Sequence, residues 1–238
     1  MNVQAAIARP VPIKLRVHDF LLLKEAGAFA AFTKSELLQG ELWGVPRGRE
    51  EEPDYDSSFP IQLRIADYEL LERSGAFEGY RKTELIDGVV YAMNPQYRPH
   101  MFAKDELAYR LRRSLEAAGS NLHVGIEGSV ALSDVDLPLP DILLTDEPKG
   151  AGPVPGRSIR MLVEISTTSL DYDLSHKARI YAARSVPEYW VVDVNAGVIH
   201  QMWSPGGGAY AERREVKLGE RIEAATIAGL AVETAGIS

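Results

Sequence analysis

The sequence predicts an α/β protein in which helices pack against a central mixed β-sheet. Three observations support this fold class. Residues 101–118 carry a long apolar stripe with helical spacing, short strand-like segments follow from residue 122, and a second helical segment at about residues 173–184 separates two groups of these strands. The order helix, strands, helix, strands is typical of a mixed sheet with helices packed on it.

Length and composition limit the class of protein. The 238 residues, of which 45% are apolar, suffice for one domain of ordinary size with an appendage. No apolar run approaches the roughly 20 residues of a membrane helix, and the N-terminus lacks the pattern of a secretion signal. We therefore expect neither membrane association nor export. The absence of cysteine excludes disulfides and thiolate metal sites, and it is compatible with the cytoplasmic location that we expect.

The formal net charge of −8 argues against a protein that coats nucleic acid through a broad basic face. It does not exclude a nuclease, because an enzyme needs only a local basic rim. A carboxylate cluster that holds a divalent cation also contributes negative charge of its own.

The N-terminal segment repeats the segment that follows it. Residues 13–46 align with residues 61–94 at a constant offset of 48 positions, and 13 of the 34 pairs are identical. An acidic, proline-containing linker lies between the copies, at about residues 46–60. The repeat predicts an N-terminal appendage over residues 1–59 and a main domain over residues 60–238.

Each copy begins with a short helical pattern, such as residues 66–73, that ends near a glycine, Gly27 or Gly75. In the second copy, Asp87-Gly88 between two apolar pairs predicts a β-hairpin with a two-residue turn. The first copy keeps its apolar positions and must bury them. We expect it to dock as an extra helix and strand on an exposed sheet edge, either of its own subunit or of a partner in a homodimer.

The main domain continues with a helix at about Met101–Ala118, whose leucines recur at every fourth position. Arg110, Arg112 and Arg113 lie on its other face and suit either a solvated surface or a contact with the DNA backbone. Strands are predicted at residues 123–132, 140–145 and 160–166. A helix through Arg184, capped by Asp173 or Ser175, then precedes a hairpin at 188–203 and a last strand at 209–216.

Two carboxylates occupy strand positions where solvent is excluded. Asp141 opens the strand at 140–145, and Glu164 lies inside the nearly continuous apolar strand at 160–166. A buried carboxylate must be protonated, paired with a cationic side chain or bound to a cation. Together with the main-chain carbonyl of Ile165, these side chains supply the oxygen ligands that magnesium prefers, with manganese as a possible substitute. The alternative is that Glu164 merely pairs with a buried Arg or Lys.

Lys177 follows Glu164 by 13 residues, and Tyr181 lies one turn further on the same helical face. If that face covers the strand ends, the ammonium group could orient a nucleophile or offset charge on a phosphate. The competing interpretation is a surface pair between Asp173 and Lys177, which would contribute little.

Five motifs in this order resemble the Uma-type endonuclease family of the PD-(D/E)XK restriction-endonuclease-like superfamily. They span roughly residues 61–230 and comprise TELIDG (83–88), PD (140–141), LVEIS (162–166), DLSHKARIYAARSVPEYWVVD (173–193) and the single His100 before the long helix. The resemblance implies a restriction-endonuclease-like core with Asp141 and Glu164 as the metal-binding pair. It also implies a further acidic residue near the site at Glu84.

The chain departs from the superfamily pattern two positions after Glu164, where Ser166 stands in place of a lysine. Lys177 matches the helical lysine of the family. His100 either contacts substrate or caps the helix. The resemblance thus implies a magnesium-dependent endonuclease that hydrolyses DNA. The alternative class is a weakly active or inactive nuclease fold that binds nucleic acid or another protein.

Overall fold

The computed structural model describes residues 10–48, 58–93 and 95–237, and these residues form two compact units. We call residues 10–93 with 134–137 the hairpin unit, and residues 95–133 with 138–237 the sheet unit. Within the described residues, no helix combines the length and the apolar character needed to cross a membrane.

A six-stranded mixed sheet forms the centre of the sheet unit, in the order β14-β13-β12-β11-β9-β7. Its strands are β7 (His123–Ile126), β9 (Ile142–Thr145), β11 (Ile159–Ser166), β12 (Glu188–Asp193), β13 (Val198–Gly206) and β14 (Ala209–Lys217). The pair β11–β12 is parallel and the other pairs are antiparallel, so the predicted mixed α/β class is confirmed. Strand β11 is buried along almost its whole length, as its apolar sequence predicts.

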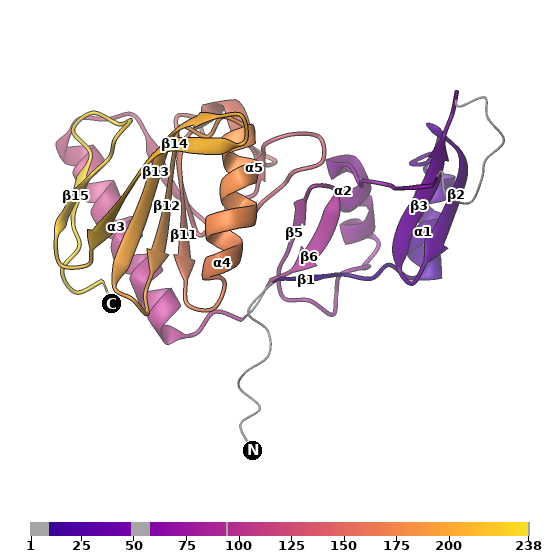
Figure 1. Cartoon of the computed structure of the whole chain (residues 1–238), viewed down its shortest axis with the longest axis horizontal. Coiled ribbons are helices and arrows are strands. Elements are labelled where there is room, and N and C mark those ends of the chain that lie inside the picture. The colour runs from indigo at the N-terminus through magenta and orange to yellow at the C-terminus, as the bar shows by residue number, and fades with distance from the viewer. Residues whose placement is uncertain (1–9, 49–57, 94, 238) are drawn as a thin grey trace, which may run out of the picture. The chain divides into compact units, whose positions relative to one another are not determined.

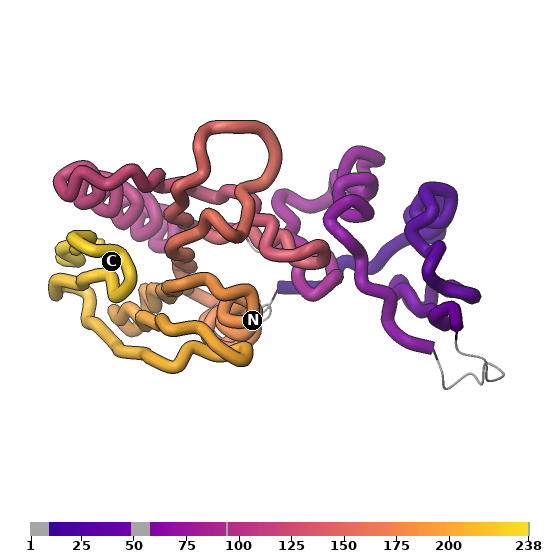
Figure 2. Tube along the Cα trace, turned by 90° about the horizontal axis from the view of Figure 1, so that it is seen from above, coloured from indigo at the N-terminus to yellow at the C-terminus, as the bar shows by residue number. Residues whose placement is uncertain are grey.

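Helices cover both faces of this sheet (Figures 1 and 2). The long helix α3 (Arg98–Ala117) packs its buried face against one side, where Val163 and Ile165 of β11 and Trp190 of β12 point. On the other side, Tyr181 from the second helical segment stacks edge-on against Tyr189 of β12. Alternate residues of a strand point to opposite faces, so Glu164 lies on the face opposite α3.

The second helical segment starts earlier than the sequence predicts. It comprises α4 (Leu170–Tyr172), a π-helical turn η3 (Asp173–Lys177) and α5 (Ala178–Ala183). Neither Asp173 nor Ser175 caps it, because both lie inside the helical turns and Ser169 takes the N-cap position. Helix α3 also begins three residues before the expected Met101, since Pro99 is tolerated in the first turn.

Short elements complete the sheet unit. They are β8 (Val130–Ala131), β10 (Val154–Pro155), the 3₁₀ turn η2 (Gly156–Ser158), β15 (Arg221–Glu223) and β16 (Ala231–Glu233). The β15–β16 pair places Ile222 and Val232 in the core beside α3. The sequence did not predict this pair.

In the hairpin unit the two copies have the same order of elements. The first contains β1 (Val11–Pro12), α1 (Val17–Glu25), β2 (Phe32–Leu38) and β3 (Glu41–Pro46); the second contains β4 (Phe59–Pro60), α2 (Ile65–Arg73), β5 (Thr83–Ile86) and β6 (Val89–Ala92). Both helices begin with an arginine N-cap and an aspartate capping box, through Asp19 and Asp67. The predicted Asp87-Gly88 turn is confirmed, with both residues at positive φ.

The copies exchange their first strands. Strand β1 pairs with β6 of the second copy, and β4 pairs with β3 of the first, at equivalent registers. Of the first copy, only β1 joins the sheet of the second, and the hairpin β2–β3 forms a separate sheet with β4. The expected docking of the first copy on a sheet edge, of its own subunit or of a partner, stays a prediction. Both copies belong to the same compact unit. The domain boundary between residues 59 and 60, which was expected from the repeat, stays a prediction.

Candidate active site

The ends of two neighbouring strands bring Asp141 and Glu164 together. Ile142 of β9 pairs with Val163 of β11, so the next position along the ladder brings Asp141 beside Glu164. Both side chains are buried, with Asp141 5% and Glu164 4% exposed. The structure thus combines the two carboxylates that the sequence singled out, in a place where unpaired charge would be costly.

Four nitrogen groups surround the Asp141 carboxylate. Its Oδ2 accepts a hydrogen bond from the Ile165 N–H at 2.8 Å and lies 3.0 Å from His100 Nε2. Its Oδ1 accepts one from Gln96 Nε2 at 3.1 Å and lies 3.7 Å from Lys104 Nζ. These contacts hold the carboxylate in one orientation.

Three of these groups come from α3 and the residues just before it. His100 and Lys104 lie one turn apart on the same face of the helix, and Gln96 precedes its N-cap Tyr97. Lys104 is 7% exposed, and its Nζ donates to Gln96 Oε1 at 2.6 Å and also to the Glu127 carboxylate. His100 is not the helix cap, because Tyr97 is. Its buried Nδ1 has no hydrogen-bond partner among the described residues.

The sequence patterns did not identify Gln96, Lys104 and Glu127 as residues of this site. The only local signal is the spacing of four between positions 96, 100 and 104, with polar residues on a face that is otherwise apolar. The sequence around Lys104 would also suit an exposed helical lysine. Lys104 is buried because the fold brings it close to Asp141, and its own neighbours in the sequence do not show this.

Glu164 accepts two hydrogen bonds at one oxygen from the helical segment that covers its face. Lys177 Nζ donates to Oε1 at 3.0 Å, and the Tyr181 hydroxyl donates to the same atom at 2.9 Å. Lys177 is 3% exposed and Asp173 is also buried, so the interpretation of these residues as a surface pair is wrong. The structure instead contains the buried pairing of Glu164 with a lysine that we gave as the alternative to metal binding.

The π-helical turn η3 ends at Lys177. Such turns add one residue to a helical turn, shift the side chains that follow and occur often at functional sites. Here Lys177 and Tyr181 both point to Glu164, which confirms that they share one face. Ser166, at the position of the usual lysine, is buried, with its hydroxyl 3.4 Å from that of Ser169.

Tyr189 lies beside this cluster and stays protonated. Its pKa is raised well above the ordinary value, first by burial and then by the carboxylates of Asp173 and Glu164. Its hydroxyl donates to the main-chain oxygen of Asp173 at 3.2 Å. The residue therefore adds a neutral hydroxyl to the site and no negative charge.

The oxygen groups of the site fit a hard divalent cation. In an extended strand the N–H and C=O of one residue point to the same side, so the Ile165 carbonyl faces the side on which its N–H meets Asp141. Across residues 10–48, 58–93 and 95–237, no three His, Asp or Glu side chains converge as a ligand set. Two carboxylates, one carbonyl and solvent correspond to magnesium, which keeps several waters.

Glu84 lies in the hairpin unit, on β5 opposite Tyr91, and is 1% exposed. Its role stays a prediction.

The three arginines of α3 have different surroundings. Arg110 donates to Glu106 at 2.7 Å, Arg112 donates to the Val124 carbonyl at 3.4 Å, and Arg113 lies over the ring of Tyr109 at 5.9 Å. A DNA contact by these arginines also stays a prediction.

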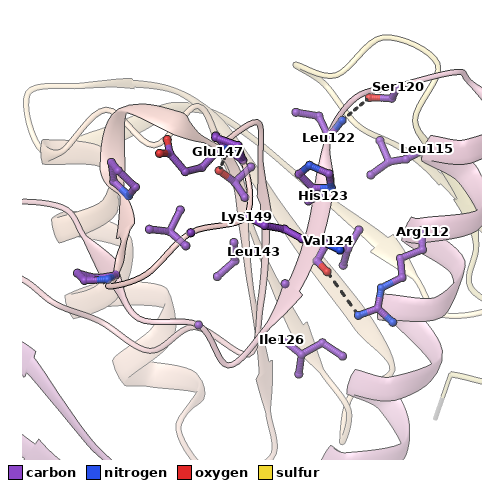
Figure 3. Close-up of a pocket in the computed structure, with 18 of the residues that line it drawn as sticks. Arg112, Leu115, Ser120, Leu122, His123, Val124, Ile126, Leu143, Glu147 and Lys149 are labelled. Atoms are coloured by element: carbon purple, nitrogen blue, oxygen red, sulfur yellow. Dashed lines mark hydrogen bonds between the residues drawn. The ribbon is translucent and has the colours of Figure 1, made fainter.

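A cavity of about 580 Å³ opens over β7 and the loop that follows β9 (Figure 3). Apolar side chains such as Leu143 line it together with Arg112, Glu147 and Lys149. None of the described residues that line it is Asp141, Glu164 or Lys177, so this cavity is distinct from the carboxylate site.

Comparison with known proteins finds one family model and several solved structures that match. The sequence model of the Uma2 family, described as “Putative restriction endonuclease”, matches residues 65–235, well over half of the chain. Among solved structures, the chain is similar to a “putative nuclease belonging to DUF820” from Anabaena variabilis, with 13% identity and a TM-score of 0.45, over 59% of this chain and 80% of that one. A search of curated proteins finds no match.

Proposed function

The chain belongs to the Uma2 family of restriction-endonuclease-like proteins, and from this premise we propose that it is a magnesium-dependent endonuclease that hydrolyses phosphodiester bonds of DNA. One observation supports the proposal most directly. Two buried carboxylates from neighbouring strands meet where a main-chain N–H and a buried lysine also converge. Hydrolysis would break one P–O bond, with water supplying a hydroxyl to phosphorus and a proton to the leaving oxygen.

Asp141, Glu164 and the carbonyl of Ile165 would hold the cation. When bound, magnesium would supply Lewis-acid stabilisation of a phosphate oxygen and lower the pKa of a nearby water. The Ile165 N–H and the Gln96 amide orient the Asp141 carboxylate before any ligand arrives. This preorganisation reduces the cost of arranging the site during the reaction.

Lys177 would act on the phosphate. Its ammonium group is already held at Glu164 Oε1, so a small rotation of its flexible end would direct it to a phosphate oxygen of a substrate placed near this carboxylate. The Tyr181 hydroxyl remains to keep Glu164 Oε1 oriented. The charge of Lys177 would then offset the negative charge that builds up on the phosphate in the transition state.

Lys104 would balance the charge of Asp141, and His100 would help to orient this carboxylate. Lys104 Nζ and His100 Nε2 lie at different oxygens of Asp141. Because Lys104 is 7% exposed, solvent screens its charge little. By family resemblance, Glu84 would add a further carboxylate near the substrate.

Cleavage assays test the proposal. Purified protein is incubated with plasmid, single-stranded and branched DNA in magnesium, in manganese and in EDTA. We expect cleavage only with metal, and its loss in Asp141→Asn and Glu164→Gln. Glu215→Gln, which alters an exposed carboxylate of the same sheet, serves as the matched control. Cleavage in EDTA, or full activity in either site variant, would contradict the assignment.

Calorimetric titration with manganese separates binding from chemistry. Asp141→Ala and Glu164→Ala should each lose measurable binding, because either change leaves too few fixed oxygens for the cation. Parent-like affinity in either variant would place the metal elsewhere.

One observation favours the second candidate, a nuclease fold that binds without cutting. Side-chain or main-chain donors already occupy both oxygens of Asp141, and Lys177 pairs with Glu164. A site whose charges are balanced internally can be structural. DNA binding that is independent of metal, with no cleavage of any substrate, would support this candidate.

A further inference from the structure

The two copies in the hairpin unit differ at one edge. The outer edge of β5, in the second copy, is covered by Asp134–Leu137, a segment that joins the hairpin unit from much later in the chain. The corresponding outer edge of β2, in the first copy, pairs with no other strand among the described residues. The edge of β5, with Asp134–Leu137 bound to it, is therefore a guide to the kind of segment that the edge of β2 can bind.

Five hydrogen bonds attach this segment to the second copy. They are Leu85 N–H to Leu137 O at 3.3 Å, Leu137 N–H to Leu85 O at 2.7 Å, Gly88 N–H to Val135 O at 2.9 Å, Ile65 N–H to Asp134 O at 2.7 Å and Asp87 N–H to Asp136 Oδ1 at 2.8 Å. Four are main-chain bonds, so the segment is recognised chiefly as extended backbone. The fifth requires an acceptor side chain at the position of Asp136.

Burial adds selectivity for side chains. Asp136 is 0% exposed and Leu137 is 6% exposed once the segment is in place. On the receiving side, Leu85 and Ile86 of β5 are completely buried. The segment thus delivers one acidic and one apolar side chain into the second copy.

The first copy presents the same backbone. Its hairpin turn has Gln39 at φ 51° and Gly40 at φ 80°, against 49° and 71° for Asp87 and Gly88. Leu37 pairs with Leu42 just as Leu85 pairs with Val90. The N–H groups that bind the segment in the second copy therefore have equivalents with the same orientation in the first.

Apolar side chains at the open edge are exposed. Leu38, the counterpart of the fully buried Ile86, is 51% exposed, and Val17, the counterpart of Ile65, is 67% exposed. A strand that pairs with another strand on one side only is a template for a further strand. Leu38 and Val17 are apolar side chains that an added strand would cover.

Charge at this edge favours an acidic segment. The pKa of Arg64 is raised mainly by its hydrogen bond to Asp67, and the carboxylate of Asp134 raises it further. The counterpart of Arg64 is Arg16, which pairs with Asp19 in the same way and whose pKa the carboxylate of Glu78 also raises. The Arg16 side chain is 60% exposed, so its guanidinium is accessible to an acidic residue at the position of Asp134.

From these observations we infer that the outer edge of β2 is a docking site for an extended segment of a partner protein, with an Asp-aliphatic-Asp-Leu sequence like that of Asp134–Leu137. The partner would add a strand to β2, place its second aspartate at the Gln39 N–H and bury its leucine beside Leu37, the counterpart of Leu85. The inference is independent of the nuclease chemistry, since it rests on the hairpin unit alone.

A peptide with the sequence of residues 132–139, LSDVDLPL, is the probe. Fluorescence anisotropy of the labelled peptide with the full-length protein should show saturable binding. We expect Leu38→Asp to weaken it at least tenfold, because that change puts a charge at the apolar edge. Val89→Asp, at an exposed apolar position of β6, should leave it unchanged. A scrambled peptide of the same composition should not bind.

Disulfide trapping then locates the peptide, because the chain contains no cysteine. A peptide with cysteine at the position of Leu137 should form a mixed disulfide with Leu37→Cys much faster than with Val89→Cys. Absence of saturable binding, undiminished binding to Leu38→Asp, or equal trapping at both cysteines would overturn the inference. A doubling of mass with concentration in light scattering, if Leu38→Asp abolished it, would also overturn the inference. In that case a second copy of this chain would occupy the edge of β2.

Discussion

Replacing Lys177 by methionine probes the buried pair at the candidate active site. The pair joins side chains that are 3% and 4% exposed, at an Nζ to Oε1 distance of 3.0 Å. At that distance the Coulomb attraction is about 5 kcal/mol with an effective dielectric constant of about 20. Methionine keeps the apolar stem but leaves the Glu164 carboxylate buried without its ammonium partner. Breaking such a pair from one side costs roughly 3–5 kcal/mol.

We therefore expect Lys177→Met to lower the free energy of unfolding by about 3 kcal/mol or more in EDTA, and to reduce DNA cleavage on the order of 100-fold. The double variant Glu164→Gln, Lys177→Met should lose much less stability than the sum of its single changes, because no charge remains buried. Urea unfolding followed by tryptophan fluorescence measures these differences, since Trp190 is completely buried.

Magnesium adds a second measurement. A ligand at 100 times its Kd stabilises the folded state by about 2.7 kcal/mol. The cation should stabilise Lys177→Met more than the parent, because the variant retains both carboxylates with less compensating positive charge. Lys149→Met, at an exposed position, should change stability by only about 0.5 kcal/mol. A loss below about 1 kcal/mol for Lys177→Met, or the same loss with and without magnesium, would refute this reasoning.

Three further predictions concern the hairpin unit. Pro12→Cys with Tyr91→Cys should form an intrachain disulfide, seen as faster migration on a non-reducing gel, because these residues are cross-strand partners; interchain products would contradict the strand exchange. Asp19→Asn should cost about 1 kcal/mol at pH 7. Burial raises the pKa of Asp19, but hydrogen bonding to Arg16 outweighs this effect and lowers that pKa. The cost of Asp19→Asn should therefore vanish as the pH falls through the pKa of Asp19 in the folded state. A cost that persists in acid would exclude this mechanism. Glu84→Ala should impair cleavage, whereas Glu36→Ala, at the equivalent position of the first copy, should not. Equal losses in the same assay would remove Glu84 from the site.

Much of the sheet unit could be predicted because its strands are strongly patterned. The apolar run of β11 identifies a central strand, and the carboxylate of Glu164 within it is conspicuous. The four-residue spacing of Lys177 and Tyr181 placed both on one helical face, where the structure has them. These are local signals, and local signals survive in a single sequence.

Other features depend on contacts between distant segments. The start of α3 carries Lys104 toward Asp141, but nothing near Lys104 distinguishes it from a solvated lysine. The π-helical turn at Asp173–Lys177 has no sequence marker, so the helix was placed too late. The repeat revealed two equivalent segments, yet periodicity does not state which hairpin each first strand joins. The pairing of each first strand depends on strand edges that become adjacent only in the folded chain.

The exchange of first strands also affects the order in which the chain can fold. Val11 pairs with Ala92, 81 positions away, so the first strand has no partner until the last strand of the second copy has formed. Contacts between such distant positions slow folding, because the closure of a long loop must precede the stabilisation that they provide. During synthesis β1 would emerge long before its partner β6. Once formed, the exchange would couple the two copies, so that unfolding of either hairpin would remove a strand from the other and the unit would melt in a single transition.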